Sequence, residues 1–268
     1  MKFRECTFSL SGVIPLASYE NSRPGFSITA ELAENEELES AMSFCQRYLH
    51  GLMEMEINRG KAEYIERAYA DKIRFYEKDG RKYPSVTSIL YWDAEWHVTR
   101  DHLTQLASRG TIVGSMVETY LATGLWLDPE TSPLLVDDVA ILKTGSSKLS
   151  WDDCSHKAFC EKFGKDITVE NVQGTVFNDE HIYAGTYDIL GTFEGKKALM
   201  DVKCGGHNMA QLAAYAVCAP DVTTMVVLPV GPTDNKCGYM RPIICEDIQG
   251  EFEKFLQARA KFKARFGI

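Results

Sequence analysis

The chain has 268 residues, of which 45% are hydrophobic and 25% are charged, as in an ordinary globular protein. Its 38 acidic and 29 basic residues give a net charge of −9, which argues against a protein that coats nucleic acid through bulk charge. No apolar run approaches the roughly 20 residues that cross a bilayer. We therefore expect a cytoplasmic protein without a membrane partner.

The eight cysteines are scattered along the chain, and no two of them form a C-x2-C pair. Zinc ribbons and iron–sulfur clusters group their ligands more tightly. In a reducing compartment, such thiols are expected to be free and mostly buried.

Residues 1–70 are predicted to form an N-terminal β/α extension. Up to about residue 32, apolar residues are separated by glycines and prolines, which indicates extended structure. From residue 35 to residue 59, apolar positions recur at helical spacing.

Residues 71–268 are predicted to form the second domain. Its first half should contain a strand and an Asp-Gly turn over 73–84, helices over 85–90 and 108–121, an irregular section over 123–147, and a helix over 149–163 that Ser150 caps. Its second half should contain a strand over 167–177, a hairpin over 182–203, a helix over 208–218, strands over 223–230 and 239–244, and a helix over 246–266. From residue 150 onward the order begins α-β-β-β-α-β.

The predicted hairpin brings two acidic residues together. With the turn centred on Glu194-Gly195, the numbers of opposed residues sum to 389, so Asp188 faces Asp201. Opposed Cβ atoms lie about 4.5–5.5 Å apart, where like charges destabilise the pair. A divalent cation would remove that cost. Lys203 follows Asp201 by two residues and projects from the same face.

Four motifs in this order resemble those of a known family. They are Glu170 on the strand before the hairpin, Tyr-x-Gly-x-x-Asp at 183–188, Asp-Val-Lys at 201–203, and Gln-x-x-x-Tyr at 211–215. Together they resemble the PD-(D/E)XK nuclease superfamily, and within it the RecB-like, phage-type exonucleases, over about residues 80–230. The resemblance implies an α/β fold with a restriction-endonuclease-like αβββαβ core, a central mixed sheet flanked by helices.

The resemblance also implies roles for the charged residues of the hairpin. Asp188, Asp201 and the backbone carbonyl of Val202 would bind Mg²⁺ or Mn²⁺, which prefer hard oxygen ligands. Lys203 would orient the attacking water or stabilise charge on the phosphate. Such a site hydrolyses phosphodiester bonds.

Four further residues have two interpretations each. Glu170 is a metal ligand in the family, or an exposed acid on a strand. Gln211 and Tyr215 share one helical face and lie near the catalytic centre in the family, or they contribute packing. Where relatives often have a histidine ligand, this chain has Gly114. Glu118, one helical turn later, either replaces that histidine or faces solvent.

The function that the resemblance implies is an exonuclease in phage-type recombination or repair. Its partners would be DNA and a single-strand annealing protein, and a homo-oligomer is a further expectation. Two alternatives stay open: an endonuclease of the restriction or junction type on the same core, and a non-catalytic DNA-binding or assembly protein.

Overall fold

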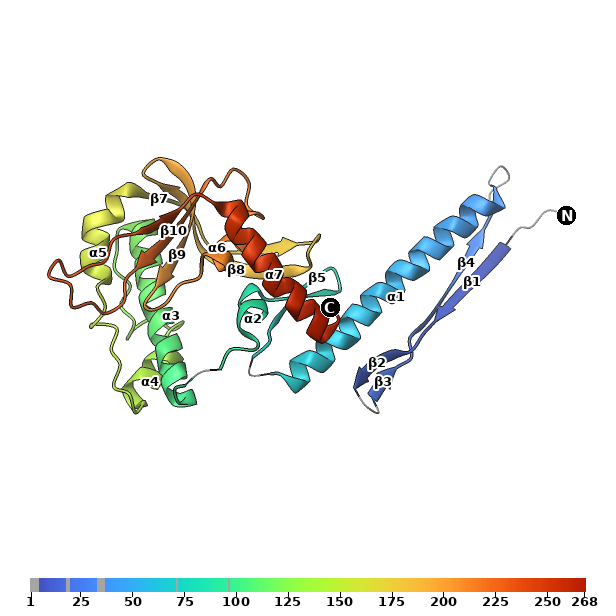
Figure 1. The fold of residues 1–268 in the computed structure, drawn as a ribbon, viewed down its shortest axis with the longest axis horizontal. Coiled ribbons are helices and arrows are strands. Elements are labelled where there is room, and N and C mark those ends of the chain that lie inside the picture. The colour runs from blue at the N-terminus through green and yellow to red at the C-terminus, as the bar shows by residue number, and fades with distance from the viewer. Residues whose placement is uncertain (1–4, 18–19, 33–36, 71, 96) are drawn as a thin grey trace. The chain divides into compact units, whose positions relative to one another are not determined.

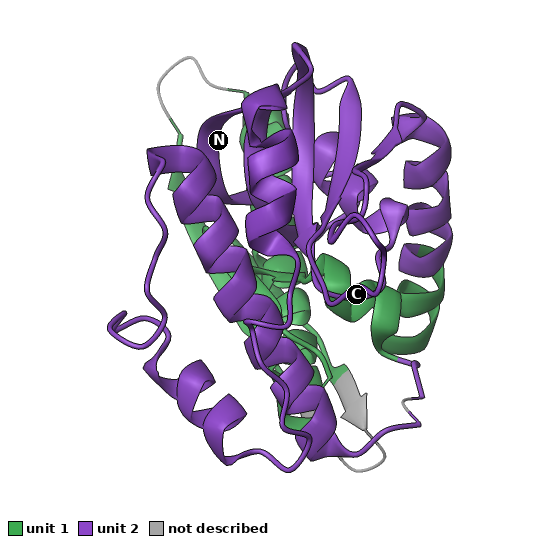
Figure 2. Ribbon diagram, turned by 90° about the vertical axis from the view of Figure 1, so that its left-hand side faces the viewer, with its two compact units in different colours: residues 1–92, 260–268 green, residues 93–259 purple. Residues whose placement is uncertain are grey.

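A computed structural model describes residues 5–17, 20–32, 37–70, 72–95 and 97–268 (Figure 1). The protein is a mixed α/β structure with a five-stranded mixed sheet flanked by helices. It divides into two compact units: unit 1 holds residues 1–92 and 260–268, and unit 2 holds residues 93–259 (Figure 2). None of the described helices is long and apolar enough to span a bilayer.

Unit 1 begins with short antiparallel strands and a long helix. Strand β1 (Glu5–Ser11) pairs with β4 (Gly25–Glu31), and β2 (Ile14–Ala17) pairs with β3 (Glu20–Ser22). Helix α1 (Leu38–Ala68) packs against β1 and β4. Its first half buries a residue at every fourth position, which is the spacing of one helical face: Ala41, Cys45, Leu49 and Met53.

The hairpin of β5 (Phe75–Lys78) and β6 (Arg81–Pro84), with helix α2 (Val86–Tyr91), also belongs to unit 1. The Lys82 N–H donates to Asn58 Oδ1 of α1 at 2.9 Å. At the other end of the chain, Lys61 of α1 donates to the carbonyl of Gly267 at 3.1 Å. Because these segments pack on α1, the compact units divide after Trp92 rather than at residue 70, where the sequence pattern changes.

Unit 2 contains the five-stranded sheet. Its strands are β7 (Ile167–Asn178), β8 (Tyr183–Phe193), β9 (Lys196–Lys203), β10 (Thr224–Pro229) and β11 (Ile243–Cys245), in the order β11-β10-β9-β8-β7. Strands β9 and β10 are parallel, and the crossover between them contains helix α6 (Met209–Ala216); the other pairs are antiparallel.

The remaining helices are α3 (Arg100–Thr123), α4 (Val136–Thr144), α5 (His156–Phe163) and α7 (Ile248–Phe266), with a 3₁₀ turn at Gly164–Asp166. Helices α3 and α5 pack on the sheet. Val117 of α3 and Phe159 of α5 join Met200 and Val202 of β9 in one buried cluster. Since side chains alternate along a strand, Asp201 and Lys203 point to the other face of β9.

Three expected details of unit 2 differ from the structure. Helix α3 begins at Arg100 because the Thr99 hydroxyl accepts a hydrogen bond from the His102 N–H at 3.2 Å, so the helix starts well before residue 108. Helix α4 forms in the section expected to be irregular. Ser150 does not cap α5, because its hydroxyl accepts from the Asp152 N–H in a local turn and the helix begins at His156.

The turn of the β8–β9 hairpin provides a test of the register. Gly195 has a φ of +79°, and an added Cβ would have no atom within 4 Å. The Gly195→Ala side chain therefore causes no clash, and the substitution is costly only because alanine disfavours the left-handed backbone conformation. We expect it to lower the free energy of unfolding by about 1–2 kcal/mol in urea titrations. Gly206→Ala, which also has open space but no left-handed φ, should stay within about 0.5 kcal/mol of the parent.

Candidate functional site

The β8–β9 hairpin has the predicted turn and register. Glu194 and Gly195 have positive φ angles of 48° and 79°. The ladder runs from Phe193 opposite Lys196 to Ile189 opposite Met200, so opposed numbers sum to 389. Asp188 and Asp201 occupy the next positions, where regular pairing has ended.

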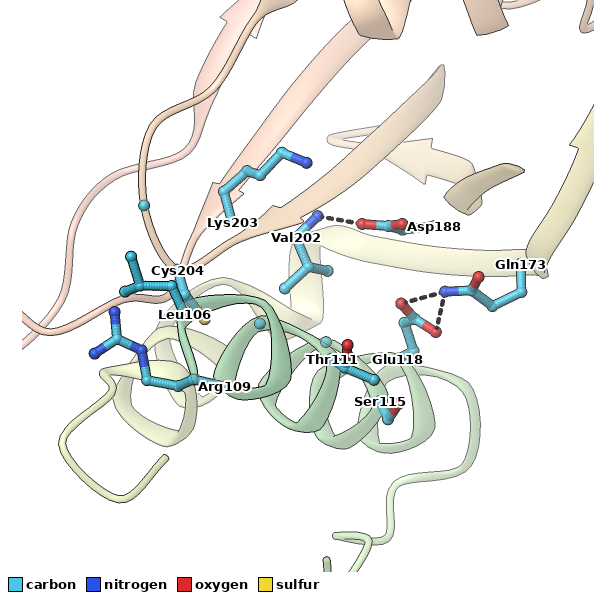
Figure 3. Close-up of a pocket in the computed structure, with 13 residues that line it drawn as sticks. Leu106, Arg109, Thr111, Ser115, Glu118, Gln173, Asp188, Val202, Lys203 and Cys204 are labelled. Atoms are coloured by element: carbon cyan, nitrogen blue, oxygen red, sulfur yellow. Dashed lines mark hydrogen bonds between the residues drawn. The ribbon is translucent and has the colours of Figure 1, made fainter. Parts of the chain in front are cut away.

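The two strands separate at these acids because a side chain replaces a backbone acceptor. Asp188 Oδ2 accepts a hydrogen bond from the Val202 N–H at 2.8 Å (Figure 3). In a strand, the N–H and C=O of one residue point toward the same neighbour. The Val202 carbonyl is therefore directed to the side on which Asp188 lies, as a metal-ligand role for this carbonyl requires.

Asp188 and Asp201 lie next to each other, Asp188 half-buried and Asp201 deeply buried. Burial, with the neighbouring negative charge of Asp201, raises the pKa of Asp188 to about 7. Burial likewise raises the pKa of Asp201, which is 3% exposed. The Lys203 ammonium lies 2.8 Å from Asp201 Oδ2 and opposes that shift. The three charged side chains thus form one electrostatic group.

A third carboxylate comes from α3. Glu118 is 8% exposed, and both of its carboxylate oxygens accept hydrogen bonds from Gln173 Nε2, at 2.8 and 2.9 Å. Burial, with a smaller contribution from the charge of Asp188, raises the pKa of Glu118 to about 7. Glu118 therefore belongs to the electrostatic environment of the aspartates and does not simply face solvent.

The Glu118 carboxylate lies near the place of the missing histidine. A Cβ added at Gly114 would stand 3.7 Å from Glu118 Oε1. A histidine at position 114 would therefore begin next to this carboxylate. Glu118 thus presents its carboxylate next to the place where the family's histidine ligand would stand. Its role as a metal ligand stays a prediction.

Gln173 was not singled out by the sequence. Val172 pairs with Ile189 and Gly174 pairs with Tyr187, so Gln173 stands opposite Asp188 across β7–β8. Its φ of +53° interrupts the regular ladder there. Nothing in the spacing of the motifs marks a glutamine at this position, because the local distortion that aims it at Glu118 arises only in the folded sheet.

Glu170, by contrast, is an exposed residue at the irregularity in β7 between Val169 and Asn171, and it forms an ion pair with Lys197. It does not line the cavity described below. The geometry thus gives no support to its predicted role as a metal ligand and fits the alternative of an exposed strand acid.

Gln211 and Tyr215 do share one face of α6, as predicted, and Gln211 Nε2 donates to the Tyr215 hydroxyl at 3.3 Å. Both are buried. The Tyr215 ring lies against Gly185, where an added Cβ would come within 2.4 Å of Tyr215 Cε1. Neither side chain lines the cavity, so their structural contribution is packing on β8, and a catalytic role stays a prediction.

A cavity of about 550 Å³ joins α3 to the ends of the central strands. Its α3 wall consists of Leu106, Arg109, Gly110, Thr111, Gly114, Ser115 and Glu118, and its sheet wall consists of Gln173, Asp188, Val202, Lys203, Cys204 and Gly205. Figure 3 shows Arg109 and Glu118 toward opposite ends of this row of residues. One end of the cavity is acidic and the other is basic.

Arg109 is a buried cation at the basic end, with 9% of its surface exposed. It lies near the sulfur atoms of two cysteines of unit 2. The pKa of Cys154 is lowered by a hydrogen bond with Cys204 and by the charge of Arg109, against the opposing effect of burial. Both thiols are free.

The donor set was tested for its fit to a divalent cation. Among the described residues, no group of three His, Cys, Asp or Glu side chains stands ready to hold a metal. Mg²⁺, however, is typically bound by one or two carboxylates, with waters and substrate phosphates completing the shell. Asp188, Asp201 and the Val202 carbonyl match that pattern, and burial of the two acids raises their pKa values in spite of the opposing charge of Lys203.

These pKa shifts predict how stability depends on pH. An aspartate with a folded pKa near 7 holds its proton where the unfolded chain, with a pKa of about 3.9, has released it. Its contribution to the free energy of unfolding therefore falls as pH rises from about 4 to 7. In chelator, the stability of the parent relative to Asp188→Asn should decrease by on the order of 2–4 kcal/mol between pH 5 and pH 8 in urea titrations.

A difference that is the same at both pH values would contradict this assignment. Comparison with Asp188→Asn cancels the opposite trend from His156, whose buried imidazole has a lowered pKa and favours folding as pH rises. Added Mn²⁺ should stabilise the parent more at pH 8 than at pH 5, because the carboxylates must be ionised to bind it.

The contact between Gln173 and Glu118 gives a second prediction. Gln173→Leu removes both donors to a buried carboxylate, so at pH 8 the free energy of unfolding should fall by about 1–3 kcal/mol. In a Glu118→Gln background the same change should cost less, which a double-mutant cycle measures. Equal losses in both backgrounds would show that Gln173 acts independently of Glu118.

Comparison with known proteins adds no family assignment to this geometry. No protein-family model matches the sequence, and no curated protein matches it. The functional interpretation therefore depends on the residues of this chain and their arrangement.

Proposed function

We propose that the chain is a Mg²⁺- or Mn²⁺-dependent DNA nuclease of the PD-(D/E)XK type, and specifically an exonuclease of phage-type recombination or repair. One observation carries the proposal: Asp188, which is half-buried, and Asp201, which is fully buried, lie together where β8 leaves β9, with Lys203 2.8 Å from Asp201. Buried like charges are costly unless a cation compensates them. Two acids, a strand carbonyl and a lysine are suited to phosphodiester hydrolysis.

The sheet supports the same proposal. The antiparallel β7–β8–β9 meander followed by α6 and the parallel strand β10 agrees with the β-β-β-α-β part of the expected core. Gly185, within the Tyr-x-Gly-x-x-Asp motif, packs under Tyr215 of the Gln-x-x-x-Tyr motif. The motifs that carry the resemblance are therefore physically connected in the folded chain.

Each residue of the group has a definite task in this proposal. Asp188 and Asp201 would hold the cation with the Val202 carbonyl. When bound, a divalent cation supplies Lewis acidity and makes a coordinated water more acidic. Lys203, held by Asp201, presents an ammonium that orients the attacking water or stabilises negative charge developing on the phosphate. Glu118, held by Gln173, adds a carboxylate beside Asp188.

The wider context of the activity rests on the resemblance alone. The substrate is DNA, a single-strand annealing protein is the partner expected in such recombination, and a homo-oligomer is compatible with it. The net charge of −9 means that DNA must be held by local basic groups rather than by the whole surface.

The test is digestion of end-labelled DNA with Mg²⁺ or Mn²⁺. Asp201→Asn and Lys203→Met should each lower the rate by at least about 100-fold, because each removes charge at the reacting phosphate. Glu170→Gln is the matched control: its carboxylate pairs with Lys197 outside the cavity, so its activity should stay within a few-fold of the parent.

Unchanged cleavage in both Asp201→Asn and Lys203→Met would refute the proposal. Loss of activity in Glu170→Gln would restore this acid as a ligand. Degradation of linear DNA with survival of circular DNA identifies an exonuclease, whereas cutting of circles identifies an endonuclease. Comparison of 5′- and 3′-labelled duplexes and single strands gives the polarity and strand preference.

A non-catalytic DNA-binding protein is the second candidate. Gly114 in place of a histidine ligand, and the lack of a three-ligand group among the described residues, are the observations that favour it. It predicts that DNA is retained without turnover under every divalent metal tested.

A further inference from the structure

The basic end of the cavity contains a cation that no described residue pairs with. Among the described residues, the Arg109 side chain has no hydrogen-bond or ion-pair partner, and its Nε–H is fully enclosed without an acceptor. A buried charge costs several kcal/mol unless it is paired, and an unsatisfied buried donor adds about 1–3 kcal/mol. A ligand that supplied an anion would offset both costs.

The surroundings of Arg109 leave room for that anion. Neighbouring positions of the cavity wall are small: Gly110 and Gly205 have nothing within 4 Å of an added Cβ. Thr111 and Ser115 contribute hydroxyl groups to the same wall. The nearby thiols of Cys154 and Cys204 are weak hydrogen-bond acceptors and cannot replace an oxyanion.

The position of Arg109 separates it from the acidic end of the cavity. Glu118 follows Arg109 by nine positions along α3, which is about 13.5 Å at 1.5 Å per residue. The acids are thus placed to bind a cation, whereas Arg109 lies away from them.

We propose that Arg109 forms a phosphate-binding subsite of this cavity, which takes a phosphate group of a nucleic-acid strand whose scissile bond lies at the aspartates. A planar guanidinium matches phosphate oxygens in a two-point contact and is preferred over lysine for this purpose. The inference deepens the proposed nuclease function and rests on it for the identity of the strand. The phosphate is either an internal one or the terminal one of the strand.

The test is binding without turnover. Fluorescence anisotropy in chelator measures the affinity of short labelled single strands that carry a 5′-phosphate, a 3′-phosphate or only hydroxyl ends, with inorganic phosphate as competitor. Arg109→Met should weaken binding about tenfold or more, and Arg109→Lys should weaken it less. Arg241→Met, which removes an exposed arginine of the same unit, should reproduce neither loss.

The three labelled strands distinguish binding of an internal phosphate from binding of a terminal phosphate. Equal weakening on all three strands identifies an internal phosphate, whereas weakening confined to one phosphorylated end identifies the terminal phosphate. Binding of every strand by Arg109→Met within twofold of the parent would overturn the subsite.

A stability measurement separates this role from a structural one. Because the ligand-free protein carries the cost of a buried unpaired charge, Arg109→Met should unfold at the same or a higher urea concentration than the parent. A marked loss of stability that Arg109→Lys restores would identify Arg109 as a structural residue and overturn the proposal.

Failure of the phosphate subsite can also be distinguished from failure of the proposed nuclease function. A chain that binds strands through Arg109 but never cleaves them retains the subsite and loses the nuclease function. A chain that cleaves DNA with Arg109→Met as well as the parent does retains the function and loses the subsite.

Discussion

The site depends on the point at which the β8–β9 ladder opens. Pairing ends with Ile189 and Met200, and the Asp188 carboxylate takes over as acceptor for the Val202 N–H. This single exchange ends the ladder at the two acids, of which Asp201 is fully buried. The turn at Glu194-Gly195 fixes the register, and the register alone decides that the acids meet.

Charge in the cavity is separated rather than cancelled. Lys203 compensates Asp201, and the neutral amide of Gln173 holds Glu118, so no full counter-charge reaches the acid of α3. At the other end, the Arg109 side chain has no partner within the part of the chain that the structure describes. Such an arrangement costs the ligand-free protein stability, and a bound cation and a bound phosphate would each offset part of that cost. Sites that bind charged ligands generally show this pattern of perturbed groups.

Small residues make the close packing around the site possible. Gly185 accommodates the ring of Tyr215, and Gly174 lies under the ring of Tyr187, whose hydroxyl accepts from Asn171. Any larger side chain at either glycine would push an aromatic ring away from the sheet. The aromatic contacts hold the far half of β8 in place after it has left β9, which keeps Asp188 at a fixed position.

The sequence by itself determined the local part of this structure. Alternation, turn residues and helical spacing predicted the succession of strands and helices along residues 167–266 and the opposition of Asp188 and Asp201, because these follow from a tight turn and from local periods. The start of α3, the existence of α4 and the extent of the compact units were missed or differently placed, since caps and packing partners decide them. Only the tertiary structure decided which distant residues join the aspartates: it brought in Gln173 and Arg109 and left Glu170 outside. Gln173 reaches the site because its position in β7 is distorted, and Arg109 reaches it because α3 packs on the sheet. The spacing of residues along the chain encodes neither feature.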